Sequence, residues 1–155
     1  MSTASPSTRA ATSLPAAVTE LPVEYLFRLH LELTKRHVSP GGPEGAEVFL
    51  GIIDGTFDGP RLHGRVVPLI GTSRAVLRGQ GFARFDYTIP LVTDDHAAIT
   101  ITGSGISRLV DGRQPRVAFT FHTGASQYEW LNSVQAVGIG TGGHDEVTYE
   151  VYRLL

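Results

Sequence analysis

Hydrophobic and polar residues alternate with a period of two along most of this chain, which predicts β-strands. Between residues 23 and 34 the odd-numbered positions are apolar, while the even-numbered positions include Arg28, His30 and Glu32. Comparable patterns predict further strands at residues 47–53, 62–69, 74–77, 82–93, 97–106, 116–123, 131–139 and 146–154. The one helical turn that we expect is short and spans residues 125–131.

The segments between these strands are rich in Gly, Pro and Asp, and we expect loops or turns at 39–45, 54–60, 78–81, 94–96, 111–112 and 140–143. About eight short strands joined by short turns are typical of antiparallel sandwiches and barrels. Strands and helices do not alternate along the chain, so a parallel α/β sheet is not expected. Because a closed barrel leaves no apolar edge exposed, we predict an all-β fold, an antiparallel closed β-barrel of about eight strands. A barrel of that size holds side chains or one small ligand in its lumen.

Length and composition argue against several classes of function. The chain has 155 residues and a formal net charge of −2, which fits one domain and argues against nucleic-acid binding. It has no cysteine, so disulfides, thiolate nucleophiles and iron–sulfur clusters are excluded. Six scattered histidines give no metal-binding pattern, and no apolar run is long enough to span a membrane. We expect a disordered tail at 1–21, a single domain at 22–155 and a cytoplasmic location.

Four segments, in this order and spacing, resemble a bacterial and fungal family of small barrels catalogued as a domain of unknown function. They are IDGTFDGPRLHGRVVP at 53–68, FDY through TDD at 85–95, YEWLN at 128–132 and VTYEVY at 147–152. The family is akin to allene oxide cyclases and plant dirigent proteins. The resemblance implies an allene-oxide-cyclase-like barrel, of a kind that is often oligomeric, whose lumen suits a small, largely apolar molecule. The relatives of the family catalyse or steer the cyclisation of reactive intermediates without a cofactor, and the family itself has no settled activity.

The chain departs from the family pattern at several positions. Where the family has an aspartate and a tryptophan, this chain has Thr72 and Ser73, and Thr88 stands where the family has an arginine. A family glycine and a family glutamate fall at His96 and His122, whereas Asp86 matches. The resemblance therefore implies that half of an Asp–Arg cluster is lost here, which points to a different substrate or to no catalysis.

The strand at 82–91 offers two interpretations. If its polar face lines the lumen, Asp86 has a raised pKa and shuttles a proton, Arg84 stabilises enolate charge, and His122 is a third candidate acid–base group. If its apolar face lies inside instead, Arg84 and Asp86 are a surface pair of little energetic weight.

Aromatic residues supply the candidate pocket wall. In an extended segment, Tyr128, Trp130 and Asn132 would share one face and could orient a carbonyl or hydroxyl group; otherwise they plug the barrel and cap its backbone. The other expected substrate contacts are Tyr25, Phe57, Tyr87 and Phe121.

Three functions fit these observations. The first is a cofactor-independent isomerase or cyclase acting on a small, apolar, oxygenated metabolite, polyketide-like or phenol-like, in the lumen. The second is a non-catalytic binding protein for a hydrophobic small molecule. The third is an interaction module whose barrel is filled by its own side chains.

Overall fold

A computed structural model describes residues 3–4, 16–17, 19–79, 81–108, 114–143 and 145–155. The expected tail at 1–21 and turn at 111–112 lie largely or wholly outside these residues. The described part consists mainly of β-strands, with a 3-10 helix, η1, at Ser126–Ser133. The strands are β1 (Val23–Leu33), β2 (His37–Gly42), β3 (Gly45–Asp58), β4 (His63–Val66), β5 (Thr72–Arg78), β6 (Phe82–Thr93), β7 (Ala98–Arg108), β8 (Arg116–His122), β9 (Ala136–Gly142) and β10 (Glu146–Leu154).

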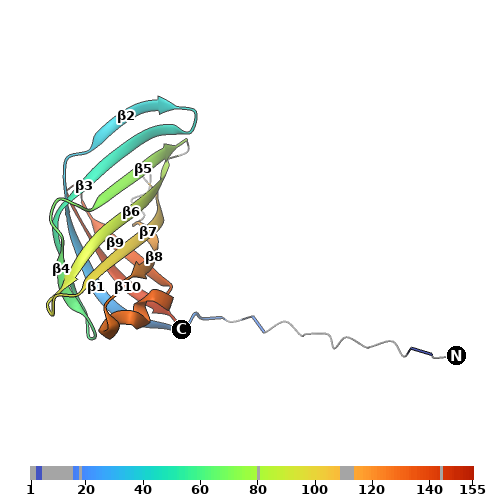
Figure 1. Ribbon diagram of the computed structural model, residues 1–155. Helices are drawn as coiled ribbons and strands as arrows, with labels where there is room; N and C mark the ends of the chain where they lie inside the picture. The colour runs from blue at the N-terminus through green and yellow to red at the C-terminus, as the bar shows by residue number, and fades with distance from the viewer. Residues whose placement is uncertain (1–2, 5–15, 18, 80, 109–113, 144) are drawn as a thin grey trace.

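The strands close into one antiparallel barrel (Figure 1). β1 pairs with β10 on one side and with β3 on the other, which joins the two ends of the sheet. Between β6 and β3, the short strands β4 and β5 follow one another along a single position of the ring. The ring therefore has eight positions, and the predicted closed antiparallel β-barrel is confirmed.

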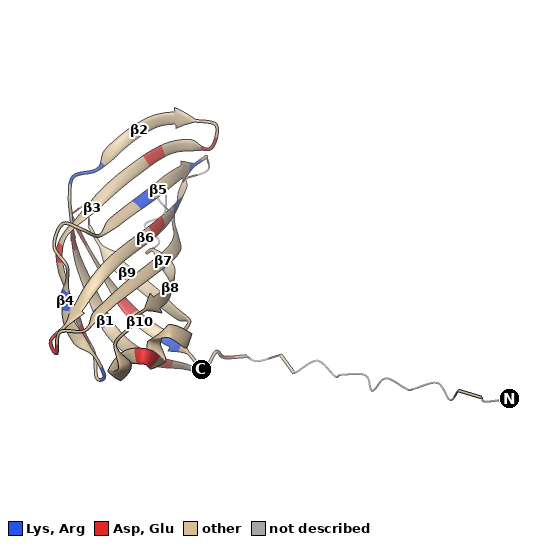
Figure 2. Ribbon diagram, in the orientation of Figure 1, with Lys and Arg blue, Asp and Glu red and all other residues tan. Residues whose placement is uncertain are grey.

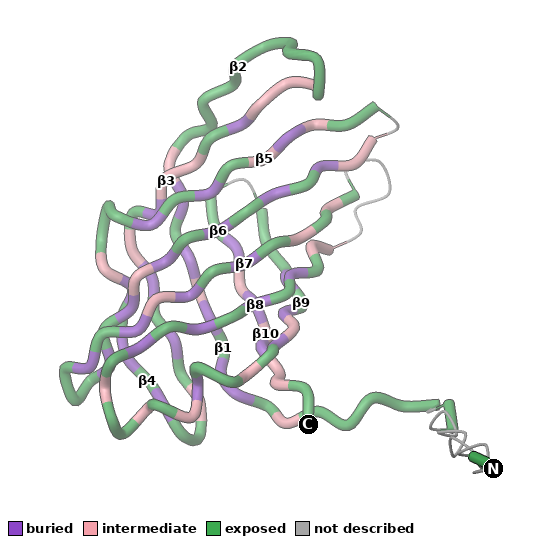
Figure 3. The backbone as a smooth tube through the Cα atoms, turned by 45° about the vertical axis from the view of Figure 1, so that its right-hand side comes forward, coloured by how far each residue is buried: buried purple, intermediate pink, exposed green. Residues whose placement is uncertain are grey.

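Strand β6 shows which face of the sheet lies inside. Phe85 and Tyr87 are buried, while Arg84, Asp86 and Thr88 between them are exposed. Strands β1, β7 and β8 show the same alternation, which Figure 3 displays as alternating buried and exposed segments. Burying the apolar face stabilises the fold by about 25 cal/mol for each Å² of surface removed from water. Enclosing the charged face would desolvate ions without partners.

Glycines on the inner face make room for aromatic rings. Gly103 on β7 and Gly138 on β9 flank Phe119 of β8, and a Cβ added to either would lie 2.7 Å or 2.6 Å from its ring. Phe119 is fully buried and meets the Tyr149 ring edge-to-face at 5.6 Å. The rings therefore fill the space over two strands that carry no side chain at these positions.

The two ends of the barrel differ. Helix η1 lies across one end, where its Leu131 is fully buried (Figure 1). At the opposite end, β2, the first half of β3 and β5 extend beyond the other strands. Inner side chains toward that end keep slight exposure, with 8% for Val48 and Phe85, whereas Leu26 and Phe27 near η1 have 0%. The end covered by η1 is closed, and the inner side chains toward the opposite end are slightly more exposed.

Three local predictions were wrong. The expected loop at 39–45 contains most of β2, an outer strand that pairs only with β3 although Pro40 removes one backbone donor. The expected turn at 54–60 is mostly the continuation of β3, which reaches Asp58. The strand expected from residue 131 begins at Ala136, because η1 occupies the residues before it.

Candidate functional site

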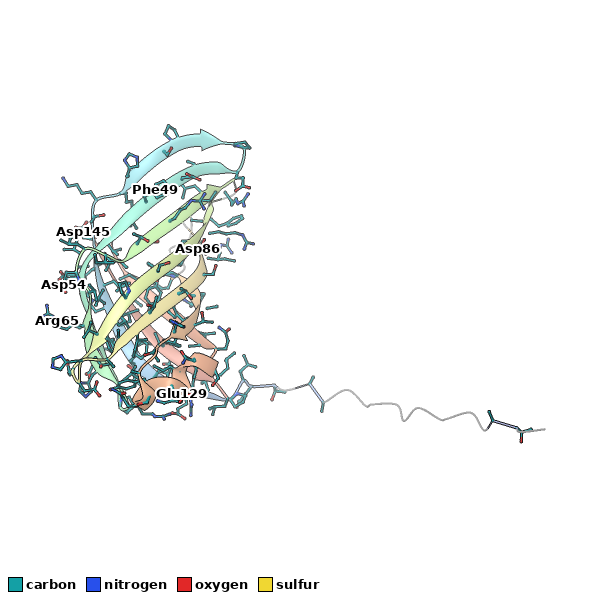
Figure 4. The ribbon with its side chains drawn as sticks, viewed as in Figure 1. Phe49, Asp54, Arg65, Asp86, Glu129 and Asp145 are labelled. Carbon is teal, nitrogen blue, oxygen red and sulfur yellow. The ribbon has the colours of Figure 1, made fainter. Side chains whose placement is uncertain are left out.

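The three candidate catalytic residues lie on the outer face of the barrel. Asp86, labelled in Figure 4, and Arg84 are exposed on β6, and His122 is exposed at the end of β8. Asp86 accepts a hydrogen bond from the Ser104 hydroxyl at 2.7 Å and borders an open hollow of about 450 Å³ on the outer wall. The lumen placement proposed for these residues was wrong, because the apolar side of the sheet faces inward.

The YEWLN segment lies within η1, at the closed end of the barrel. It is helical, and Asn132 bonds both backbone groups of Thr123, accepting at 2.8 Å and donating at 2.9 Å. The Tyr128 hydroxyl donates to the Asp95 carboxylate at 3.0 Å. The Trp130 ring lies under the Arg61 guanidinium, 3.8 Å from the ring centroid. The side chains therefore plug and cap the barrel, and the extended arrangement was wrong.

Tyr25 lies on the outer wall and not in the lumen. Its hydroxyl donates to Glu150 at 2.8 Å, and the Arg28 Nε–H donates to the same carboxylate at 2.6 Å. Burial, aided by Glu150, raises the pKa of Tyr25 to about 12. This cluster borders an outer hollow of about 280 Å³ that also contacts His30 and Asp58. Charges on this wall are paired with one another.

Phe57, Phe121 and Tyr87 do lie inside the barrel. Phe57 and Phe121 each meet the Phe27 ring edge-to-face, at 5.8 Å and 6.1 Å, and Phe57 is 1% exposed. Phe57 belongs to the sealed core near η1 rather than to a surface that a ligand reaches. Tyr87 is the one of the three that carries a polar group inward.

Two tyrosine hydroxyls meet inside the barrel. Tyr87 of β6 and Tyr149 of β10 are 62 positions apart in sequence, and their hydroxyl oxygens are 3.0 Å apart. The rings lie edge-to-face at 5.9 Å, between Phe85 and Phe119. Tyr149 was not among the predicted site residues. The signal for it was present, because Tyr149 alternates with Val147 and Val151 on the apolar face of β10.

Ser73 also lies on the inner wall, on β5. It pairs with Tyr87 on β6 and with Leu50 on β3, so the three side chains share one face. Ser73 is 5% exposed, yet its hydroxyl has no hydrogen-bond partner among the described residues. The other two buried polar residues, Thr93 and Thr123, both form hydrogen bonds to backbone groups.

The inner wall carries hydroxyl groups and no charge. Among the described residues, no Asp, Glu, Lys, Arg or His is buried, and Figure 2 shows where the charged residues lie along the ribbon. Burial raises the pKa of the Tyr87 and Tyr149 hydroxyls, and the neighbouring hydroxyl adds to the rise at Tyr149. Both tyrosines therefore stay protonated at neutral pH.

The hydroxyl pair has one hydrogen to spare. Each tyrosine has one O–H hydrogen, and the bond between the two hydroxyls uses only one of them. The second hydrogen can be donated to an oxygen atom of a bound molecule. Aromatic walls with a few inward hydroxyls are typical of small-molecule sites.

The conserved-domain comparison covers nearly all of the described barrel. The family described as "Protein of unknown function (DUF3237)" matches residues 21–154. The chain belongs to this family. The predicted membership of a small-barrel domain family of unknown function is thus confirmed.

Relatives of this chain include a protein named as an enzyme. The hydroalkoxylation enzyme phnH of Penicillium herquei is 28% identical over 129 residues, which cover 83% of this chain and 80% of that protein. A crystal structure of a Penicillium herquei enzyme has a TM-score of 0.74 at 24% identity, covering 92% of this chain and all of that one. A β-barrel-like protein from Acinetobacter baumannii has a TM-score of 0.77 at 24% identity, covering 90% and 100%. These structures share the fold.

Two further features of the described residues bear on function. No three His, Asp or Glu side chains there are grouped so that they could hold a metal ion. None of the described helices is long and apolar enough to cross a membrane.

Proposed function

We propose that this chain is an enzyme of the cyclase or isomerase type. Its substrate is a small, apolar, oxygenated molecule, phenol-like or polyketide-like, held against the inner wall toward the end opposite η1. The observation that carries the proposal is the Tyr87–Tyr149 pair, which places two hydroxyl groups 3.0 Å apart in an uncharged interior. The relative named as a hydroalkoxylation enzyme supports the reaction class.

Hydroalkoxylation adds an O–H group across a carbon–carbon double bond and closes a ring when both groups belong to one molecule. One C–O bond and one C–H bond form, while the O–H bond and the π bond break. The reaction is redox-neutral, so we propose that it proceeds without a cofactor. The barrel wall would hold the hydroxyl group near the double bond, which lowers the barrier by orientation.

The tyrosine pair suits this reaction because it can take up one proton while it gives another. As the substrate oxygen attacks, its proton passes to one tyrosine, that tyrosine passes its own proton to the second, and the second protonates the carbon atom. No tyrosinate persists, so the raised pKa values of the pair do not oppose the relay. The pair ends in its starting protonation state.

A panel of ortho-allyl phenols and naphthols tests the proposal, with chiral chromatography of the cyclic ethers formed. We expect the wild-type protein to produce one enantiomer in excess. Tyr87→Phe should lower that rate by at least about 100-fold, the size typical of a lost proton-transfer group. Asp86→Asn, on the outer face of the same strand, is the matched control and should leave the rate unchanged. Racemic product at the buffer rate throughout the panel would contradict the proposal.

The alternative is a binding protein that does not transform its ligand. One observation favours it: no carboxylate or imidazole is buried among the described residues, so the inner wall lacks a conventional base. This function predicts saturable binding and recovery of the ligand unchanged. Tyr87→Phe would then change affinity alone.

A further inference from the structure

Ser73 is a buried hydroxyl without a partner. It is 5% exposed, faces the interior beside Tyr87 and Leu50, and forms no hydrogen bond with the described residues. Its oxygen is not sealed, because the described residues contain a single fully enclosed side-chain atom without a partner, Arg153 Nε. The Ser73 oxygen therefore keeps a small solvent-accessible surface.

The Ser73 hydroxyl lacks a protein partner among the described residues, so its hydrogen-bonding capacity is available to solvent or to a bound molecule. Buried hydroxyls in native proteins nearly always have a partner. Thr93 and Thr123 follow that rule, whereas Ser73 does not. Ser73 therefore has both a donor and an acceptor that no described residue uses.

The charges around this position restrict the ligand. No charged side chain is buried among the described residues, and the hydroxyls of Tyr87 and Tyr149 remain neutral. A carboxylate or phosphate on the inner wall would therefore lose its hydration without gaining a counter-charge. A neutral molecule would not suffer that loss.

We propose that Ser73 is a substrate-binding residue that donates a hydrogen bond to a second oxygen of a neutral aromatic molecule, whose first oxygen takes the spare hydrogen of the Tyr87–Tyr149 pair. The inference rests on the proposed location of the site, but not on turnover. The substrate class is an aryl ketone or phenol with two oxygen acceptors, and carboxylated analogues are rejected.

Binding of three naphthalene probes, measured by calorimetric titration, tests this specificity. They are 1-acetyl-2-naphthol with two oxygens, 2-acetylnaphthalene with one, and the anion 2-naphthoate. We expect affinity to fall in that order, and Ser73→Ala to weaken 1-acetyl-2-naphthol by about 3- to 10-fold, the range of one neutral hydrogen bond. Thr102→Ala, which removes an outer hydroxyl, is the matched control and should change nothing.

The stability of the unliganded variant gives a second, independent measurement. Because Ser73→Ala removes a hydroxyl that has no protein partner, it should leave the unfolding midpoint unchanged, even as it weakens binding. Replacing a structural serine would instead lower the midpoint. Ser73→Trp should abolish binding of all probes by occupying the inner wall.

The outcomes separate this inference from the proposed function. If Ser73→Ala binds 1-acetyl-2-naphthol as the wild type does, or if 2-naphthoate binds as tightly as 2-acetylnaphthalene, the specificity proposed here is wrong even if cyclisation occurs. If the probes bind as expected but no compound is cyclised, the enzyme proposal fails and the Ser73 assignment stands. If no probe binds the wild-type protein, the inner-wall site itself is overturned.

Discussion

On the outer wall, Tyr25 donates its hydroxyl hydrogen to Glu150 at 2.8 Å, whereas on the inner wall Tyr87 and Tyr149 bond only to each other. Burial raises the pKa of all three. The outer tyrosine, Tyr25, already donates its hydroxyl hydrogen to the Glu150 carboxylate, and its neighbour Arg28 is paired with the same carboxylate. The inner pair retains one free hydrogen. The difference shows that a candidate catalytic group is better judged by its remaining hydrogen-bonding capacity than by its perturbed pKa.

The largest difference between the two walls is expected in how much their side chains contribute to the free energy of unfolding. Phe119→Ala empties the space over Gly103 and Gly138 and should lower the free energy of unfolding by about 3–5 kcal/mol. Thr120→Ala, on the outer face of the same strand, removes an exposed hydrogen bond to Thr102 and should lower it by less than about 1 kcal/mol. Urea unfolding measures both values. Equal losses would mean that Phe119 does not support the barrel wall.

The next largest difference between the two walls is expected in the cyclisation rate, if the two tyrosines act as a unit. Tyr87→Phe and Tyr149→Phe should each lower the cyclisation rate by at least about 100-fold, and the double variant should be no slower than either. Tyr25→Phe, on the outer wall, should retain the wild-type rate. Multiplying losses in the double variant would show that the two hydroxyls act independently.

A smaller effect is expected at the closed end. Asn132→Ala removes both bonds to the Thr123 backbone and should lower the free energy of unfolding by about 1–3 kcal/mol. Because η1 lies across the end opposite the proposed site, affinity for 1-acetyl-2-naphthol should not change. Ser133→Ala, on the same helix and exposed, is the control. A loss of affinity in Asn132→Ala would mean that the YEWLN segment contributes to substrate binding.

The smallest effect is the alkaline titration of Tyr25. Its pKa of about 12 in the folded protein lies above the ordinary value of 10.0, so folding favours its protonated form. The stability that this contributes is complete below about pH 10 and is lost as the pH rises through about 12. Difference absorbance between the wild type and Tyr25→Phe follows this ionisation. Glu150→Gln should lower the pKa, and an unchanged pKa would remove Glu150 as a cause.

Much of the fold could be predicted from the alternation alone. Strands β6 and β10 begin and end where the pattern placed them, at Phe82–Thr93 and Glu146–Leu154. Strand β2 could not be predicted, because Pro40 and the glycines after it are typical of a loop and only pairing with β3 makes them extended. The helical turn was expected, but its extent was set by contacts such as that between Asn132 and Thr123.

The candidate site was predicted only in part. The alternation allowed either face of β6 to point inward, and the family match at Asp86 favoured the face that proved to be outside. Burying Arg84 and Asp86 costs far more free energy than burying Phe85 and Tyr87, and this difference predicts the inward face of β6 correctly. The partnership of Tyr87 with Tyr149 could not be predicted from either strand, because it forms across the closed barrel.

The contact between Phe119 and its two glycines has an evolutionary consequence. A side chain added at Gly103 or Gly138 would overlap the ring, so neither position can gain bulk while Phe119 is retained. Substitutions at the three positions should be correlated among descendants of this sequence: a smaller residue at 119 is the step that permits a larger one at 103 or 138. Selection would therefore act on the three residues together, and the order in which they change would be constrained.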